Sequence, residues 1–224
     1  MAIQIETKDC TALTDADLGE MADACAGTGG GGFEVGQLSK AKEDWVLAGT
    51  ARIDGKLHGF SFSTLERIGG TPCVLIGLAS VKRTSKRDTV LKAIMAEAYH
   101  RALMAFPDED VLIGTRFVSP SGFEAFKALS DLVPRPGHKA VGEERAWGRR
   151  LAKRFDVEGT YDEKSFTVRS DGQEGFIDHE SAKPESTDAA RRALFDDVPV
   201  AAGGSLIVYG WTMAEDLVKL GARH

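Results

Sequence analysis

The sequence predicts a mixed α/β (α+β) protein built around a mostly antiparallel sheet flanked by helices, and three observations lead to this prediction. Residues 45–53 and 57–68 are rich in strand-forming side chains and flank Asp54-Gly55, the strongest short-range signal for a β-hairpin. The apolar run 73–81 suits a strand buried on both faces. Within residues 89–106, apolar side chains recur every three or four positions, which predicts a long amphipathic helix.

The N-terminal residues predict a strand and a helix before this hairpin. Residues 3–6 alternate with the period of a strand, and Thr14 offers an N-cap for a helix that ends near Cys25. Residues 27–32 contain five glycines, which predicts a loop of high backbone freedom and, less readily, a phosphate-binding loop. We do not expect residues 33–35 to open a helix.

The elements before and after the long helix complete the prediction. Gly69-Gly70 turns the hairpin into the buried strand, so residues 45–81 form a three-stranded meander, and Thr89 is expected to cap the long helix. Residues 111–117 form a strand, and Ser119-Pro120 begins a helix with an apolar stripe. That stripe consists of Phe123, Phe126 and Leu129. Later elements are a basic helix at 141–155, a weak strand at 165–169, a helix near 187–194, a strand at 205–211 and a short terminal helix.

The composition is that of a globular protein of the cytosol. The chain has 224 residues, 42% hydrophobic and 28% charged, with a formal net charge of -6 that disfavours nucleic acid and anionic lipid as partners. No apolar run reaches the roughly 20 residues that span a bilayer, and the first ten residues lack a secretion signal. The three cysteines, Cys10, Cys25 and Cys73, are widely spaced and predict buried thiols rather than a metal site.

The order strand, helix, hairpin, buried strand, polar loop, long helix, strand, helix resembles the core of the GCN5-related N-acetyltransferases (GNAT), from about Ile3 to Leu129. In that family, the strand equivalent to residues 73–81 splays from its neighbour and its backbone binds the pantetheine arm of acyl-CoA. The following loop holds the pyrophosphate at a helix N-terminus, where backbone N–H groups and the helix dipole stabilise an anion. The resemblance divides the chain into a GNAT-like acyl-CoA-binding core, 1–134, and an extension, 135–224, packed on or completing the same sheet.

The same resemblance implies acetyl-CoA as cosubstrate and a set of cofactor-binding residues. Lys82, Arg83, Lys86 and Arg87 place four cations within six residues and would contact phosphates. The implied cofactor-binding residues are Leu78, Ala79, Val81, Arg83, Lys86, Arg87 and Thr89. The alternative is a solvated basic loop that caps a core helix.

Two departures from the family pattern weaken a catalytic interpretation. The loop from Arg83 to Asp88 has none of the glycines that allow the backbone to approach phosphate, and Asp88 adds a negative charge. Phe126 stands where the family has a Tyr that protonates the leaving thiolate, and a phenyl ring has no proton to donate. A substitute would be Ser121, Ser119 or Tyr99, although Tyr99 is also a natural core residue of its helix.

Candidate general bases are Glu66, on the second hairpin strand, and Glu34, after the glycine-rich loop, with His58 as a third. Each is equally compatible with an ordinary surface position. The resemblance therefore implies an N-acetyltransferase that transfers an acetyl group directly to a primary amine of a small molecule or peptide, in a possible homodimer. The alternative function is a GNAT-shaped binding or scaffold protein without catalysis.

The C-terminal part is similar to GNAT-like bacterial proteins in which a late apolar strand, here residues 204–210, closes the sheet. The helix of 141–155 carries Arg145, Arg149, Arg150, Lys153 and Arg154. These cations predict a solvated face or a contact with an acidic partner, and Trp147 is expected to pack inward.

Overall fold

The computed structural model describes residues 2–25, 33–169 and 187–221, so the glycine-rich loop at 27–32 lies outside the described residues. The strands are β1 (Ile3–Asp9), β2 (Leu47–Ile53), β3 (Lys56–Ile68), β4 (Thr71–Val81), β5 (Val111–Phe117), β6 (Ser130–Val133), β7 (Tyr161–Asp162), β8 (Thr167–Val168) and β9 (Ser205–Thr212). The α-helices are α1 (Asp15–Cys25), α2 (Val35–Asp44), α3 (Arg87–Ala105), α4 (Gly142–Arg154), α5 (Ala189–Ala193) and α6 (Ala214–Leu220). A 3-10 helix, η2, spans Pro120–Glu124.

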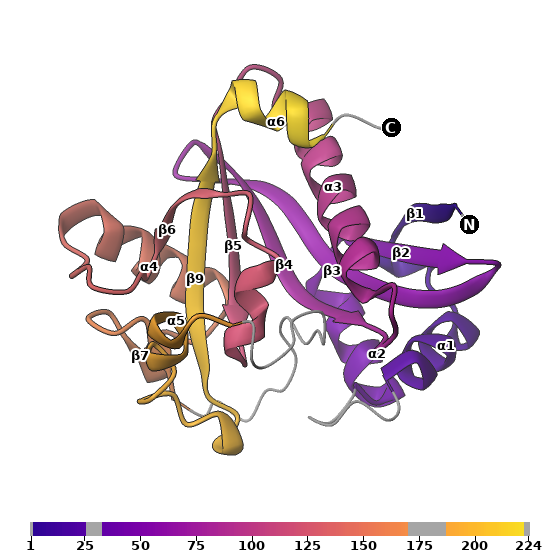
Figure 1. Ribbon diagram of the computed structural model, residues 1–224, viewed down its shortest axis with the longest axis horizontal. Coiled ribbons are helices and arrows are strands. Elements are labelled where there is room, and N and C mark those ends of the chain that lie inside the picture. Colours follow the sequence, from indigo (N-terminus) through magenta and orange to yellow (C-terminus); the bar gives the residue numbers. More distant parts are fainter. Residues whose placement is uncertain (1, 26–32, 170–186, 222–224) are drawn as a thin grey trace.

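These strands form one nine-stranded sheet with the order β1-β2-β3-β4-β5-β9-β8-β7, and β6 also pairs with β9 (Figure 1). Every neighbouring pair is antiparallel except β4 and β5, which α3 connects. The predicted fold class is confirmed. Strand β9 pairs with the whole of β5, from Val111 opposite Thr212 to Phe117 opposite Leu206, so the last strand lies beside the middle of the chain.

Local turn chemistry explains the N-terminal meander. Asp54 and Gly55 connect β2 to β3 with positive φ angles of 50° and 78°, as a two-residue hairpin turn requires. Gly69 and Gly70 connect β3 to β4 with φ angles of 60° and 91°. The predicted meander is confirmed, and β4 is buried from its second residue onward.

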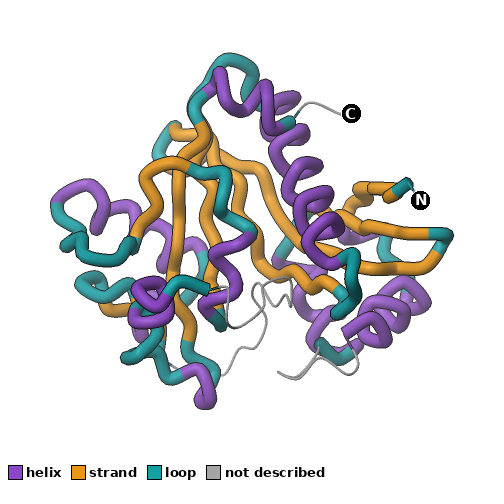
Figure 2. The backbone as a smooth tube through the Cα atoms, viewed as in Figure 1, coloured by secondary structure: helices purple, strands orange, loops and turns teal. Residues whose placement is uncertain are grey.

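Helices cover both faces of the sheet (Figures 1 and 2). On one face, a Cβ atom at Gly59 would contact Val90 of α3 at 2.8 Å. On the other face, helices α1 and α2 and strands β3 and β4 share a separate apolar cluster that contains Phe60 and Leu78. Helix α4 packs behind β5, where a Cβ atom at Gly114 would lie 3.1 Å from Leu151.

The structure contradicts one prediction in the N-terminal half. Residues 33–35 do open a helix, because Glu34 forms a capping box with Gln37 and Glu34 N donates to Gln37 Oε1 at 2.8 Å. Helix α2 therefore fills the segment that precedes the hairpin. Trp45 ends this helix as its C-cap, so β2 begins two residues later than predicted, at Leu47.

Three further boundaries differ from the predictions. Helix α3 begins at Arg87, so Thr89 lies in its first turn and is not the cap. The helix predicted from Pro120 is the short 3-10 helix η2, after which the chain enters β6 because β9 offers it an edge to pair with. The strand predicted at 165–169 is confined to β8, since Phe166 has a positive φ of 63°.

Candidate active site

Strands β4 and β5 separate part-way along their length. Their parallel pairing runs from Cys73 opposite Leu112 to Ile76 opposite Thr115 and goes no further among the described residues. Beyond Ile76, β4 continues through Val81, and β3 is its only neighbour among the strands of the described part of the chain. At the last pair, Thr115 Oγ1 donates a buried hydrogen bond of 2.7 Å to the carbonyl oxygen of Ile76. The backbone edge of β4 from residue 77 to 81 is thus open toward β5.

The open edge leads into the cationic turn at residues 82–87. Lys82 N donates to His58 O at 2.7 Å, which anchors the start of the turn to β3. Arg87 N donates to Thr84 O at 3.2 Å, and the N-cap residue of α3, Lys86, makes no side-chain capping bond. The positive end of α3 therefore lies in a turn with exposed basic side chains.

Asp88 moderates the charge of this turn. Its Oδ1 lies 3.7 Å from Nε of Arg87, and the Asp88 side chain is 71% exposed. Because this one carboxylate stands against four cations, residues 82–88 keep a net positive charge.

The residues expected to bind the cofactor follow one another along this open end of β4 and the turn. The side chains of Leu78, Ala79 and Val81 are buried, so this stretch of β4 offers the opening backbone groups, from alternate residues, rather than side chains. Arg83, Lys86 and Thr89 are exposed, and Arg87 is partly exposed. The structure thus brings the seven residues together as a backbone edge followed by basic side chains.

Of the two carboxylates expected as bases, Glu66 lies away from this opening. Glu66 sits opposite Cys73, at the paired end of β4, and both of its oxygens accept from Arg154 Nε, at 2.7 and 3.0 Å. Glu34 is exposed and caps α2. Both carboxylates have structural partners, so neither has the unpaired, desolvated environment that a general base needs.

The candidate proton donors lie around η2 and α3. Ser121 Oγ and Ser119 Oγ hydrogen-bond to one another within η2 and its cap. Phe126 is fully buried, with its ring centroid 5.1 Å from that of Phe117. Tyr99 is 3% exposed, and its hydroxyl has no hydrogen-bond partner among the residues that the structure describes.

A groove of about 430 Å³ runs between α3 and residues 124–128, with Leu220 of α6 at its rim. Its α3 wall extends from Asp88, next to the cationic turn, to Tyr99. The groove and the unpaired edge of β4 therefore both begin at the N-terminal end of α3.

Comparison with solved structures finds acetyltransferases. An aminoglycoside acetyltransferase from an uncultured soil metagenomic sample, in complex with sisomicin, is 15% identical over 50% of this chain and 76% of its own, with a TM-score of 0.35. A Bacillus subtilis acetyltransferase in complex with CoA is 15% identical over 64% of this chain and 91% of its own, with a TM-score of 0.39. A GNAT-family acetyltransferase from Streptococcus pneumoniae is 11% identical over 60% and 90%, with a TM-score of 0.36. No family model and no curated protein matches the sequence.

The chain has a GNAT-like fold. The topology of the chain itself has three such features. They are the strand order, the single parallel pair β4–β5 and the connection of that pair by α3. The sequence prediction of this resemblance is confirmed at the level of the fold.

Sequence reasoning missed two residues that shape the opening of this GNAT-like sheet. Trp45 covers Gly77, the first residue of β4 beyond the last pair with β5. Thr115 donates a hydrogen bond to Ile76 O at the vertex, the point where β4 and β5 separate. A glycine inside an otherwise apolar strand signals a close approach by another group, so Gly77 was the available clue.

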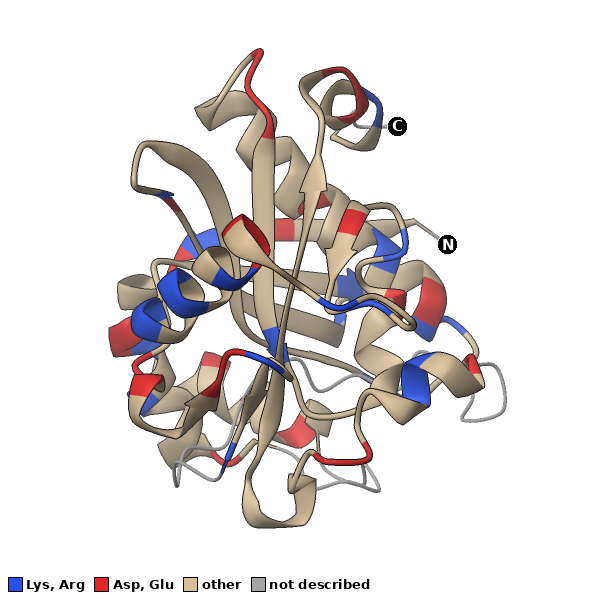
Figure 3. Ribbon diagram, turned by 90° about the vertical axis from the view of Figure 1, so that its left-hand side faces the viewer, with Lys and Arg blue, Asp and Glu red and all other residues tan. Residues whose placement is uncertain are grey.

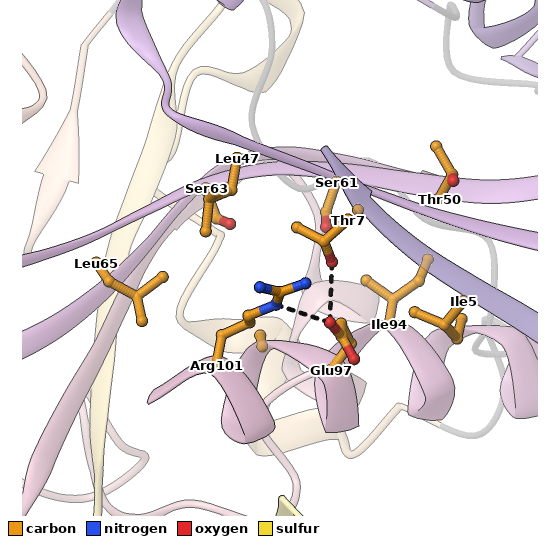
Figure 4. Close-up of a pocket in the computed structure, with 12 residues that line it drawn as sticks. Ile5, Thr7, Leu47, Thr50, Ser61, Ser63, Leu65, Ile94, Glu97 and Arg101 are labelled. Atoms are coloured by element: carbon orange, nitrogen blue, oxygen red, sulfur yellow. Dashed lines mark hydrogen bonds and ion pairs between the residues drawn. The ribbon is translucent and has the colours of Figure 1, made fainter. Parts of the chain in front are cut away.

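A polar seam lies between α3 and strands β1 to β3 (Figure 4). Thr7 Oγ1 and Arg101 Nε both donate to Glu97 Oε1, at 3.0 and 2.9 Å. The seam has a volume of about 20 Å³, the size of one water molecule and too small for a substrate. It anchors α3 to β1 rather than forming a second site.

Arg149, Arg150 and Lys153 of α4 are exposed, as expected of a solvated face, and other cations of the helix have partners within the chain. Arg149 pairs with Glu163, Arg154 pairs with Glu66, and Arg145 donates to Ala140 O. Figure 3, a view from this side, shows basic and acidic segments interspersed. Trp147 packs inward as expected, at 5% exposure.

The remaining chemistry of the described residues is limited. They contain no cluster of His, Cys, Asp and Glu that would hold a metal ion, and none of their helices is long and apolar enough to cross a membrane. All three cysteines are buried, as predicted, and burial raises the pKa of the Cys10 and Cys73 thiols to about 12.

Proposed function

We propose that the protein is an acyl-CoA-dependent N-acetyltransferase that transfers an acetyl group directly to a primary amine of a small molecule or peptide. The observation that carries the proposal is the unpaired backbone edge of β4 from residue 77 to 81, which leads into the cationic turn. A backbone edge of this kind offers donors and acceptors to the amides of a pantetheine arm, and the turn offers positive charge to a diphosphate. This arrangement of backbone edge and basic turn is the support for acetyl-CoA as the cosubstrate.

The chemical demand of direct transfer is modest. The amine nitrogen forms a bond to the thioester carbonyl carbon, the C–S bond breaks, and the amine loses a proton while the thiolate gains one. Positioning of the two reactants supplies much of the acceleration, and water can carry the protons where no side chain does. The proposal therefore survives the burial of Phe126 and the pairing of Glu66.

Titration of acetyl-CoA tests the proposal through the thermal stability of the protein. A ligand at about 100 times its dissociation constant adds roughly 2.7 kcal/mol to the stability of the native state, so the melting temperature should rise by several degrees. Replacing Arg83 and Arg87 together by Ala should remove most of that rise. Replacing Lys139 and Lys164, two exposed lysines far from the turn in sequence, controls for the loss of two charges.

The second candidate function is acyl-CoA binding without catalysis. It is favoured by the structural roles of Glu66 and Glu34, which leave no carboxylate among the described residues of the opening with the features of a base. A rise in melting temperature with acetyl-CoA but no release of free CoA thiol across a panel of primary amines would support this candidate over the enzyme. No rise with acetyl-CoA at saturating concentrations would exclude both functions.

A further inference from the structure

Strand β1 leaves a long edge of the sheet unpaired. It stands first in the strand order, and β2 is its only partner among the described strands. Figure 1 shows β1 at the margin of the sheet. The strand at the other end of the order, β7, has only two residues, whereas β1 has seven. An unpaired edge of this length offers a row of backbone donors and acceptors to another strand.

The backbone groups that point away from the sheet belong to the odd-numbered residues of β1. Cys10 N donates to Val46 O at 2.8 Å in continuation of the β1–β2 register, so the backbone groups of residue 10 point toward β2. Successive residues of an antiparallel strand direct their backbone groups to alternate sides, so the other even-numbered residues also point toward β2. The N–H and C=O groups of residues 3, 5, 7 and 9 are therefore directed outward.

The exposed face of β1 carries charges of opposite sign. Gln4, Glu6 and Lys8 project to the same face, because side chains two positions apart along a strand do so. The side chains of Glu6 and Lys8 are 59% and 39% exposed. Lys8 Nζ lies 3.9 Å from Glu6 Oε1 and 4.0 Å from Asp17 Oδ1, and exposed contacts of this length hold neither charge firmly.

These charges select one way for two copies of β1 to pair. A symmetric antiparallel pair centred on Glu6 would set two carboxylates opposite one another, and one centred on Lys8 would do the same with two ammonium groups. Centring on Ile5 would use neither charge. Centring on Thr7 places Glu6 of each copy opposite Lys8 of the other. The same register sets Thr7 opposite Thr7 and Ile5 opposite Asp9, and each such pair can exchange two backbone hydrogen bonds.

We propose that the protein forms a symmetric dimer in which two copies of β1 pair in antiparallel fashion about Thr7, so that their sheets become continuous. The Thr7 side chain does not obstruct this pairing, because its Oγ1 donates to Glu97 Oε1 of its own α3 at 3.0 Å. The open edge of β4 takes no part, so the dimer does not depend on the proposed function. The alternative is that the alternating charges protect β1 against any pairing.

The experiment measures molar mass by sedimentation equilibrium over a range of protein concentrations. Two short strands bury little surface, so wild type should pass from monomer to dimer as the concentration rises. Glu6→Lys should weaken the dimer about tenfold or more, because it sets lysines opposite one another at both ends of the joint. Glu6→Lys combined with Lys8→Glu should restore the wild-type dimer, since the exchange recreates both pairs of opposite charge.

The control is Glu158→Lys. Glu158 is exposed and begins a short 3-10 helix in the C-terminal half of the chain, so this variant carries the same change of charge outside β1. It should dimerise as wild type does. Thermal unfolding at low concentration checks the fold of each variant, because a variant that melts as wild type does and stays monomeric has lost the interface and not the fold.

Amide hydrogen exchange tests the register directly. At concentrations that favour the dimer, the N–H groups of Ile5, Thr7 and Asp9 should exchange more slowly than in dilute protein, because they donate across the joint. The N–H groups of Glu6 and Lys8, which point toward β2, should be unaffected.

Three results would overturn the proposal. A wild type that stays monomeric at every concentration would show that the charges protect the edge. A dimer that survives Glu6→Lys and leaves exchange in β1 unchanged would place the interface on another surface. Concentration-dependent protection of Ile3 in place of Asp9 would centre the pairing on Ile5 and refute selection by charge.

Discussion

The indole ring of Trp45 lies directly against Gly77: a Cβ atom at position 77 would stand 1.8 Å from Trp45 Cε2. Trp45 closes the C-terminal end of α2, and Gly77 is the first residue of β4 beyond the last pair with β5. Phe155, at the end of α4, places its ring centroid 6.2 Å from that of Trp45. The N-terminal helices and the C-terminal part therefore meet at the vertex of the β4–β5 opening.

Gly77→Ala should destabilise the protein strongly. Its methyl group would overlap a rigid ring held between β4 and Phe155, and overpacking of a close-packed site costs about 1–3 kcal/mol. Urea unfolding measures the loss. Combining Gly77→Ala with Trp45→Ala should cost less than the sum of the two single changes, because the smaller residue at position 45 relieves the overlap.

Gly19→Ala is the matched control for this substitution. Gly19 lies within α1, and a Cβ atom there would meet nothing within 4 Å. Alanine should stabilise that helix by about 0.5–1 kcal/mol. Equal effects at positions 19 and 77 would show that Trp45 does not occupy the space over Gly77.

The sequence predicted the parts of this fold whose signals are local. Asp54-Gly55 specifies the hairpin turn because both residues readily adopt positive φ angles. At the start of α1, Thr14 Oγ1 accepts a hydrogen bond from Asp17 N, as the predicted N-cap requires. Helix α2 was not predicted because its N-cap is Glu34, and glutamate is an unusual N-cap residue. The capping box that Glu34 forms with Gln37 is seen only in the folded chain.

The candidate site was harder to predict because its defining contacts are distant in sequence. The vertex bond joins residues 39 positions apart, and the pair of Arg154 with Glu66 joins residues 88 positions apart. No periodicity or motif records such contacts. The cationic turn was visible in the sequence because its four basic residues are consecutive or nearly so.

Phe126→Tyr should lower stability without increasing activity. The ring is fully buried in the apolar core beside Phe117, so an added hydroxyl enters an environment without a ready partner and should cost about 1–3 kcal/mol. Chemical denaturation and an assay of CoA thiol release check the two halves of this prediction. Phe106→Tyr is the control, since Phe106 is 8% exposed and its ring lies near the exposed guanidinium of Arg67, where a hydroxyl can reach water. A stable Phe126→Tyr variant with increased thiol release would contradict the structural role assigned to this ring.

Asp17→Asn should reduce stability in a manner that depends on pH. The Asp17 carboxylate accepts from Thr14 N at 2.9 Å and from Thr14 Oγ1 at 2.8 Å, and these bonds hold its pKa below the ordinary value of 3.8. Its contribution is therefore fully present above the ordinary value and is lost as the pH falls through the folded-state pKa. At pH 7 the variant should lose about 0.5–1 kcal/mol. Unfolding curves between pH 2 and pH 7 should show the gap from wild type closing at the acid end, and a gap that is constant with pH would refute the role of the charge.

Thr115→Val tests the bond that ends the pairing of β4 with β5. Valine keeps the shape of threonine but leaves the buried carbonyl of Ile76 without its 2.7 Å donor, which should cost about 1–2 kcal/mol. Thr50→Val is the matched control, because Thr50 Oγ1 donates to a strand carbonyl only weakly, at 3.4 Å to Glu6 O, and should cost much less. Denaturant unfolding of both variants gives the comparison.

Since the carbonyl of Ile76 is the last one that β4 directs toward β5 before the strands separate, its loss of a partner should also weaken acetyl-CoA binding in Thr115→Val and not in Thr50→Val. Equal effects on stability and affinity in the two variants would mean that the vertex is set by the packing of Trp45 on Gly77 alone.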